Sequence, residues 1–278
     1  MPVDHRRING PEDTVPYHLF SKLNIQSLSS KFADVYKNGK RKDDRKSNEH
    51  RKMFTDVGVV SQAKGSAYVE QGETKVIVAV YDPREIPNRT EYSLIGEIYC
   101  EFKYATFSCQ KRRLHQLDAE EKHYSTILKQ ALESTVCRCE FPNFQVDVYA
   151  LVLHNDGSAL SAAITAAGMA MANGGVPMYD IITSATLGVQ NNVKLLDVSL
   201  EEEKLCATNI SKEYTNGTVT LSYVNSHEQV SQIFVNGHLS LEDVTESVQM
   251  LTQACKDIVP LVQKKLVKSV YNKIQEEQ

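Results

Sequence analysis

Residues 151–180 read LVLHNDGSALSAAITAAGMAMANGGVPMYD, a pattern that places a tight turn between an apolar strand and a helix of small residues. Asn155-Asp156-Gly157 is the turn signal, and Ala and Gly dominate the residues that follow Ser158. Such a unit often presents backbone N–H groups and a helix N-terminus to a phosphate. The turn carries no Lys or Arg, so the pattern predicts the shape of a phosphate site without its cations.

The residues before this unit alternate between apolar and polar side chains, which is typical of strands. A turn at Gln71-Gly72-Glu73 predicts a hairpin between residues 66–70 and 75–81. Ile98, Cys100, Phe102 and Tyr104 are expected on one face of a further strand. Residues 118–138 have the spacing of a helix, with Asp118 as N-cap and Glu121 three residues later as in a capping box.

The residues after Ser158 complete a mixed pattern of helices and strands. Residues 158–172 form a small-residue helix that close packing on a sheet explains, and residues 240–273 form a long amphipathic helix. Strands are expected over residues 181–190, 193–199, 205–210, 217–224 and 231–236. This order of elements favours an α+β or α/β sandwich in one domain.

Composition narrows the class of protein. The chain has 278 residues, of which 41% are apolar, and no apolar run long enough to predict a membrane span. The N-terminus lacks the apolar stretch of a secretory signal. The six cysteines lack the spacing of a zinc site, and we expect them to be reduced thiols of an intracellular protein. The eight histidines are scattered, so we expect no metal site and no cofactor.

Charge is distributed unevenly along the chain. The net charge is −4, yet residues 37–52 hold eight Lys or Arg against three Asp or Glu. Two interpretations of this basic segment stay open: a solvated, flexible segment, or an electrostatic contact with RNA or an acidic partner. The acidic remainder argues against a protein that binds nucleic acid over its whole surface.

Two separated motifs resemble the RNase PH family. Residues 58–85, GVVSQAKGSAYVEQGETKVIVAVYDPRE, are similar to its first strands, and residues 156–182, DGSALSAAITAAGMAMANGGVPMYDII, are similar to its phosphate loop and the following helix. The N-terminal string MPVDHRRINGPE (1–12) resembles the opening of one type of eukaryotic exosome ring subunit.

The resemblance implies a fold and an assembly. The fold would be α+β, an RNase PH-like (ribosomal protein S5 domain 2-like) βαβα sandwich over residues 37–278, with residues 1–36 as an N-terminal extension. In this family's eukaryotic exosome branch, RNase PH-like chains pair as heterodimers within a hexameric ring around a central RNA channel, and S1/KH cap subunits sit on top. The implied locations are nucleus, nucleolus and cytoplasm, without a membrane.

The resemblance also implies that the chemistry is lost. The family's phosphate loop has Thr and Arg, whereas Ser158, Ala159 and Leu160 stand there in this chain. Its two catalytic Asp positions align with Asn191 and Asp197, and Asn cannot deliver a proton. A bidentate Arg binds phosphate far better than backbone dipoles alone, so these positions are expected to be degenerate.

RNA-guiding residues are the remaining candidates. Lys111, Arg112 and Arg113 lie in a loop that faces the channel in active relatives. Arg45 and Arg51 match the basic R-x-D-G-R…E-x-R segment, with Asp44 in place of its Gly. For the loop triplet, a solvated loop remains the alternative.

We therefore favour the hypothesis of a non-catalytic subunit of the exosome core ring, which contributes to 3′-to-5′ RNA processing and degradation by forming the RNA channel and docking cap subunits. The alternative is a phosphorolytic 3′-to-5′ exoribonuclease subunit that shares an active site with a partner chain. A standalone RNA-binding module is a third hypothesis, which the acidic body disfavours.

Overall fold

The computed structural model describes residues 36–37, 40–86, 92–190, 193–207 and 215–276. Within these residues, no helix combines the length and apolar character that crossing a bilayer requires. The elements are β1 (Tyr36–Lys37), β2 (Lys40–Arg41), β3 (Met53–Val57), β4 (Gly65–Gln71), β5 (Thr74–Val80), β6 (Arg84–Glu85), β7 (Glu97–Tyr104), α2 (Ala119–Glu133), the 3-10 turn η2 (Arg138–Glu140), β8 (Phe144–His154), α3 (Ala159–Gly174), β9 (Ile182–Gln190), β10 (Val193–Leu196), α4 (Leu200–Ala207), β11 (Asn216–Val224), β12 (Gln229–His238) and α5 (Leu241–Glu276).

The larger sheet has six strands. β3, β4, β5 and β8 pair antiparallel in that order, β6 pairs with the start of β8, and β7 runs parallel to β8. The predicted hairpin is confirmed, because β4 and β5 meet at Gly72, whose φ is +61°. The predicted alternation is also confirmed, since β7 and β8 bury one face each, formed by Ile98, Cys100, Phe102, Tyr104, Val146, Val148, Ala150 and Val152.

The smaller sheet has four antiparallel strands in the order β10-β9-β11-β12. β9 and β11 are buried along their whole length because each is covered on both faces. β12 forms an edge of this sheet and is largely exposed. Thr186 and Thr220 meet across β9 and β11 with their hydroxyl oxygens 3.1 Å apart, which satisfies two polar groups inside the sandwich.

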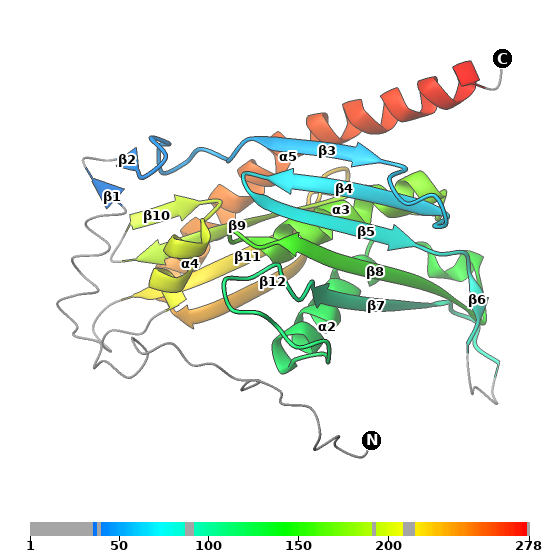
Figure 1. Ribbon diagram of the computed structural model, residues 1–278, viewed down its shortest axis with the longest axis horizontal. Coiled ribbons are helices and arrows are strands. Elements are labelled where there is room, and N and C mark those ends of the chain that lie inside the picture. The colour runs from blue at the N-terminus through cyan, green and yellow to red at the C-terminus, as the bar shows by residue number, and fades with distance from the viewer. Residues whose placement is uncertain (1–35, 38–39, 87–91, 191–192, 208–214, 277–278) are drawn as a thin grey trace, which may run out of the picture.

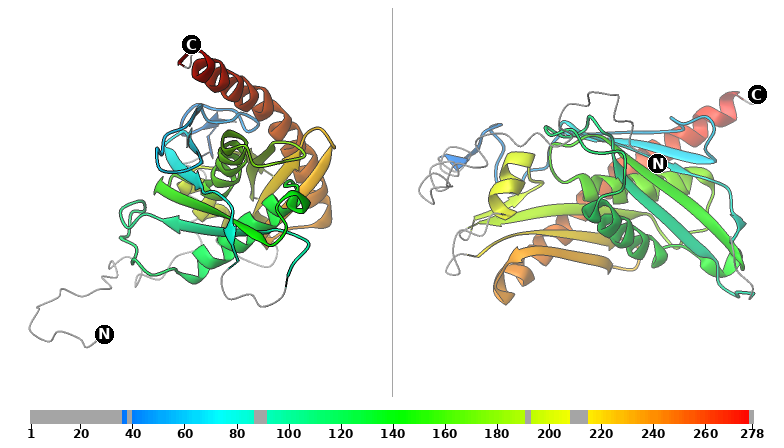
Figure 2. Two further views of the ribbon diagram at one scale, coloured as in Figure 1. Left: turned by 90° about the vertical axis from the view of Figure 1, so that its right-hand side faces the viewer. Right: turned by 60° about the horizontal axis from the view of Figure 1, so that its bottom comes forward.

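Helix α3 lies between the two sheets (Figures 1 and 2). Every residue from Ala159 to Met171 is buried, which only small or well-packed side chains permit. At Gly168 a Cβ would come within 2.7 Å of Ile182, and at Gly65 a Cβ would come within 2.2 Å of the Ala170 carbonyl, so these glycines set the helix–sheet approach. α2 packs between β7 and β12, and α5 covers the outer face of the smaller sheet.

These layers form the expected α+β βαβα sandwich: large sheet, α2 with α3, small sheet and α5. The capping-box prediction for α2 is confirmed by the Asp118 N–H, which donates to Glu121 Oε2 at 2.9 Å. The predicted 158–172 helix and the long C-terminal helix are confirmed as α3 and α5.

The strand predicted near residues 205–210 is wrong. Residues 200–207 form helix α4, and residues 208–210 lie outside the described part of the chain. The helix begins after Ser199, whose N–H donates to Glu202 Oε2 at 2.9 Å. Three Glu residues in its first turn also favour a helix start, because negative charge is stabilising at a helix N-terminus.

Candidate functional site

The turn that starts α3 packs directly against the segment after β10. Gly157 has a φ of +87°, and a Cβ there would lie 2.6 Å from the Val198 carbonyl oxygen and from backbone atoms of Ser199. Ser158 is left-handed at φ 55° and buried, and its hydroxyl donates to the Val198 carbonyl at 3.0 Å. The loop therefore keeps a folded turn in which the Ser158 side chain points into the protein.

All three degenerate phosphate-loop positions are buried. Ser158, Ala159 and Leu160 belong to the protein interior, and Leu160 and Ala159 are part of the main hydrophobic core. At the place expected for an Arg, Leu160 thus contributes apolar packing. The cavity beside these residues has a volume of about 20 Å³ and is lined also by Tyr104, Tyr124 and Glu203. That space suits a single water molecule, not a phosphate.

A carboxylate of the chain itself occupies the N-terminal end of α3. Glu203 comes from α4, and its Oε2 accepts the Ser158 N–H at 3.3 Å. Burial raises the pKa of the Glu203 carboxyl, against the hydrogen bond from Ser158, which acts to lower it. A negative group at a helix N-terminus is stabilising, so Glu203 takes the interaction that an anion would otherwise receive.

Asp197, the aligned catalytic position, is fully buried and paired with Arg51. Arg51 Nη2 and Nε donate to Asp197 Oδ1 at 2.7 and 3.0 Å, and the Arg51 N–H donates to Oδ2 at 2.8 Å. Burial acts to raise the pKa of Asp197, but the charge and hydrogen bonds of Arg51 outweigh it and hold the pKa below its usual range. The carboxylate is consequently ionised and fully engaged.

Arg51 fastens three parts of the fold together. Besides Asp197, its guanidinium donates to the carbonyls of Asp156 at 2.8 Å and Gly157 at 3.1 Å. Thr74, at the start of β5, donates to the same Gly157 carbonyl at 2.8 Å. The side chain of Arg51 is buried in these contacts, so its predicted contact with RNA requires a correction: Arg51 is a structural residue.

The rest of the basic segment is only partly solvated. Arg41 is buried and donates to the carbonyls of Asp197 at 3.2 Å and Ser47 at 3.0 Å. Arg45, another RNA candidate, pairs with Asp43 and donates to the Asp197 carbonyl at 3.3 Å. Asp44 holds a left-handed φ of 62°, the conformation that favours Gly, so the turn keeps its shape despite the substitution. Asn191 lies outside the described residues.

The loop between β7 and α2 carries the candidates that reach the surface. Arg113 lies over the Tyr104 ring at 4.1 Å and bonds Glu120 at 3.0 Å, which fixes it against the protein. Lys111 and Arg112 are exposed. Phe107, which sequence reasoning missed, is 72% exposed and lines a hollow of about 380 Å³ together with Arg112. The signal available in the sequence was an aromatic residue four positions before a basic triplet, because aromatic rings stack on unpaired bases.

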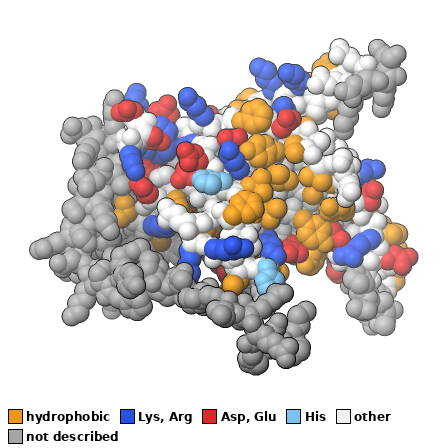
Figure 3. Space-filling model, viewed as in Figure 1, with side chains coloured by type: hydrophobic (Ala, Val, Ile, Leu, Met, Phe, Trp, Pro, Cys, Tyr) orange, Lys and Arg blue, Asp and Glu red, His pale blue; other side chains and the backbone are white. Residues whose placement is uncertain are grey.

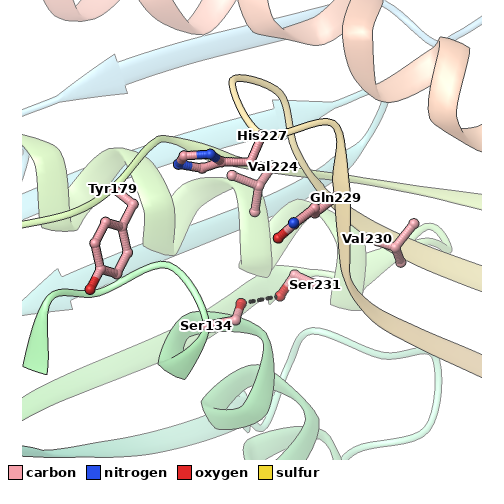
Figure 4. Close-up of a pocket in the computed structure, with 7 residues that line it drawn as sticks. All are labelled: Ser134, Tyr179, Val224, His227, Gln229, Val230 and Ser231. Carbon is pink, nitrogen blue, oxygen red and sulfur yellow. Dashed lines mark hydrogen bonds between the residues drawn. The ribbon is translucent and has the colours of Figure 1, made fainter.

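A second hollow, of about 300 Å³, lies between the C-terminal end of α2 and the turn that joins β11 to β12 (Figure 4). Tyr179 and His227 flank it, and the hydroxyls of Ser134 and Ser231 bond each other at 2.6 Å across its floor. Its lining contains no Lys, Arg, Asp or Glu, so it offers no charge for a phosphate or a metal ion. In the described part of the chain, no group of three or more His, Cys, Asp or Glu residues is placed to hold a metal.

Comparison with known proteins fits this geometry. The family described as 3′ exoribonuclease family, domain 1 (RNase PH) matches residues 49–177. The human "Exosome complex component MTR3" is 33% identical over 286 residues, which cover 97% of this chain and 96% of that protein. The chain belongs to the RNase PH family. The Arabidopsis thaliana "Exosome complex component RRP41 homolog" is also 33% identical, over 82% of this chain and 92% of that protein.

Solved structures agree with the RNase PH fold. Rice (Oryza sativa) Rrp46 has a TM-score of 0.69 at 25% identity and covers 81% of this chain and 100% of that chain. A chain of the Archaeoglobus fulgidus exosome with RNA bound to the active site has a TM-score of 0.69 at 20% identity, over 85% of this chain and 96% of that chain. The RNase PH-like sandwich expected from the two sequence motifs is therefore confirmed.

Proposed function

We propose that this chain is a non-catalytic subunit of the RNA exosome core ring, which contributes to 3′-to-5′ RNA processing and degradation. The observation that carries the proposal is the closed turn at the start of α3, where Leu160 is buried and Glu203 accepts the Ser158 N–H. The similarity to the human MTR3 component over nearly the whole of both chains supports membership of such a ring.

Phosphorolysis requires a bound phosphate and an acid that protonates the leaving oxygen. The space beside Ser158 is too small for phosphate, and no cation is directed into it from the residues that line it. Asp197 is held ionised by Arg51, whose hydrogen bonds use both of its carboxylate oxygens, so it is not available as a general acid. Both features favour a structural role over catalysis.

Ring partners need a surface, and the outer face of the large sheet offers one. Figure 3 shows hydrophobic side chains gathered over these strands on the side toward the viewer. Phe54, Tyr81, Tyr99 and Leu151 are each between 38% and 53% exposed. Tyr81 and Tyr99 both meet Tyr149 edge to face, at 5.7 and 6.1 Å between ring centroids. Contiguous exposed apolar patches mark protein interfaces, so this face suits a heterodimer partner of the same fold.

RNA would meet the chain at the loop between β7 and α2. Phe107 supplies a ring for base stacking, and Lys111 and Arg112 supply positive charge near it. We assign this loop to the wall of the RNA channel. By the family resemblance, S1/KH cap subunits dock on the assembled ring, and the chain works in the nucleus, nucleolus and cytoplasm.

The proposal is tested by reconstituting the purified ring with this chain and a single-stranded RNA, with and without inorganic phosphate. We expect that changing Asn191→Ala or Glu203→Gln leaves any release of nucleoside diphosphates unchanged, because this chain does no chemistry. Release that requires phosphate and disappears only in the Asn191→Ala ring would instead support the phosphorolytic subunit that shares a site with its partner. A chain that remains alone in size-exclusion chromatography with all ring partners present would refute ring membership.

A further inference from the structure

The hollow between the C-terminal end of α2 and the turn that joins β11 to β12 is separate from the closed turn at the start of α3. In Figure 4 the side chains of Tyr179, His227 and Gln229 surround one space, with the hydroxyls of Ser134 and Ser231 beneath it. Its volume of about 300 Å³ is at the lower end of the range for pockets that bind small ligands. The hollow therefore has room for one small ring system.

The two aromatic side chains come from segments that hydrogen bonds hold in place. The Tyr179 N–H donates to the Thr135 carbonyl at 2.8 Å, which fastens the segment before β9 to the end of α2. The Ser226 N–H donates to Asp180 Oδ2 at 2.7 Å, which fastens the turn that carries His227 to the residue after Tyr179. The Tyr179 ring itself is 61% exposed. Both rings are thus positioned before a ligand arrives, so stacking on them costs little conformational freedom.

The floor of the hollow offers hydrogen-bond acceptors. The Ser134 and Ser231 hydroxyls lie 3.0 and 2.7 Å from the Ala131 carbonyl oxygen, and their own oxygens are 2.6 Å apart. These contacts can use both hydroxyl hydrogens, whereas each hydroxyl oxygen keeps a lone pair that can accept a further bond. A ligand that covers this floor therefore satisfies it by bringing N–H donors. Gln229, exposed at the side, can both donate and accept through its amide.

The lack of charge in the lining narrows the ligand class. The described residues that form it include no Lys, Arg, Asp or Glu, so a phosphate or a carboxylate would find no cation there. An aliphatic side chain would cover the serine oxygens and the Gln229 amide without supplying partners, which is costly for polar groups. A flat, neutral ring with N–H groups on its edge meets each condition, because its faces stack on aromatic rings and its edge forms hydrogen bonds.

We propose that this hollow binds one unpaired nucleobase. Tyr179 and His227 stack on the base, Gln229 pairs with part of its edge, and the two serine oxygens of the floor accept from its exocyclic amino group. Adenine, cytosine and guanine carry such an amino group and uracil does not, so the floor selects against uracil.

The source of the base is the one part of this inference that rests on the proposed function, which brings RNA to the ring. The hollow lies at the opposite end of α2 from the loop of Phe107, since Arg113 of that loop bonds Glu120 in the first turn of α2. With 15 residues, α2 separates the two by roughly 22 Å. A base held in the hollow would add a base-selective contact to the loop contact.

Free nucleosides test the hollow directly. Ligand-observed NMR titrations of the purified full chain with adenosine, cytidine and uridine, which carry no phosphate, measure the affinity. We expect uridine to bind about two- to tenfold more weakly than the other two, because it lacks one hydrogen bond. Tyr179→Ala should weaken adenosine binding about fivefold or more through lost stacking, without lowering the thermal midpoint.

Two further variants keep this measurement specific. Tyr179→Phe retains the ring and should bind adenosine as the native chain does, and so should Tyr271→Ala, which removes a tyrosine that is 64% exposed on α5. Equal adenosine affinity in Tyr179→Ala and the native chain would overturn the proposal. A loss in Tyr179→Phe as large as in Tyr179→Ala would also overturn it, because stacking would not be the cause.

RNA in the reconstituted ring then identifies the source of the base. Filter binding compares a single-stranded oligoadenylate with an oligonucleotide of the same length that carries abasic residues. If the base comes from RNA, Tyr179→Ala weakens oligoadenylate binding about fivefold or more and leaves abasic binding unchanged. If only adenosine binding depends on Tyr179, the base comes from a free nucleoside. Failure of the chain to enter the ring would refute the proposed function and leave the nucleoside result standing.

Discussion

Replacing Asp197 by Asn should destabilise the chain far more than its conservative appearance indicates. The substitution keeps the shape of the side chain and removes only its charge, leaving the buried Arg51 guanidinium with only its longer ion pair to Asp156, at 3.4 Å. Breaking a buried ion pair in this way typically costs about 3–5 kcal/mol. Arg51 keeps its bonds to the Asp156 and Gly157 carbonyls, so the lower part of that range is expected.

Urea unfolding followed by circular dichroism measures this loss. With a urea dependence of about 3 kcal/mol per M, the midpoint should fall by roughly 1 M. The matched control is Glu201→Gln, which removes the exposed ion pair between Glu201 and Lys42 at 3.1 Å. That pair is open to solvent, and its loss should cost less than about 1 kcal/mol.

The pH dependence provides a second measurement of the same pair. Because the pKa of Asp197 is lowered on folding, its stabilising contribution is present above the unfolded-state pKa of about 3.9 and is lost as the pH falls through the folded-state pKa. The difference between the native chain and Asp197→Asn should be constant near pH 7 and shrink in acid. If Asp197→Asn costs no more than Glu201→Gln, or the difference persists in acid, the buried pair does not stabilise the fold as argued.

Four other variants probe the site and the proposed RNA loop. Burial raises the pKa of Glu203 in the folded chain, so its stabilising contribution is fully present below the unfolded-state pKa of about 4.3 and is lost as the pH rises through the folded-state pKa. Thermal midpoints measured upward from about pH 4.3 should therefore fall less for Glu203→Gln than for the native chain. Gly157→Ala should cost more than about 1 kcal/mol in urea unfolding, because its φ is +87° and its Cβ would meet the Val198 carbonyl, while an unchanged midpoint would contradict that packing. Phe107→Ala should weaken RNA binding by the ring by about 1–3 kcal/mol in filter binding, and Lys111→Ala with Arg112→Ala should reduce its salt dependence; equal affinity in all three rings would exclude the loop as an RNA contact.

Local patterns in the sequence were enough to predict most elements. Alternation predicted the buried faces of β7 and β8, and the Asp118 and Glu121 spacing predicted the start of α2, because each depends on neighbouring residues only. The strand prediction near residues 205–210 was wrong, although the sequence contains a helix-start signal just before it. Ser199 and Glu202 have capping-box spacing, and Glu202 is one of three consecutive acidic residues in the first turn. This helix signal outweighs the short apolar run that follows.

Local patterns could not predict which basic residues are buried or what they pair with. Arg51 and Asp197 are 146 residues apart, and nothing in the local pattern of either predicts that they meet. By charge alone, residues 37–52 form one basic segment. In the fold, however, Arg41 and Arg51 are buried, whereas Lys46 and Lys52 are exposed. The sequence shows Leu160 where the family's phosphate loop has Arg. It did not predict helix α4, which supplies the Glu203 carboxylate that accepts the Ser158 N–H.

The distance along the chain between Arg51 and Asp197 has a consequence for the order of events during synthesis. At about 5–20 residues per second, a ribosome needs roughly 7–30 s to add the residues that separate them. Throughout that interval Arg51 has been made while Asp197 does not yet exist. The large sheet can close earlier, since β5 pairs with β8 within residues 75–154. The nascent chain therefore carries Arg51 without Asp197, and Arg41 without Glu202, until residues 197–202 are made, and slow translation prolongs the time for which these cations can meet polyanions.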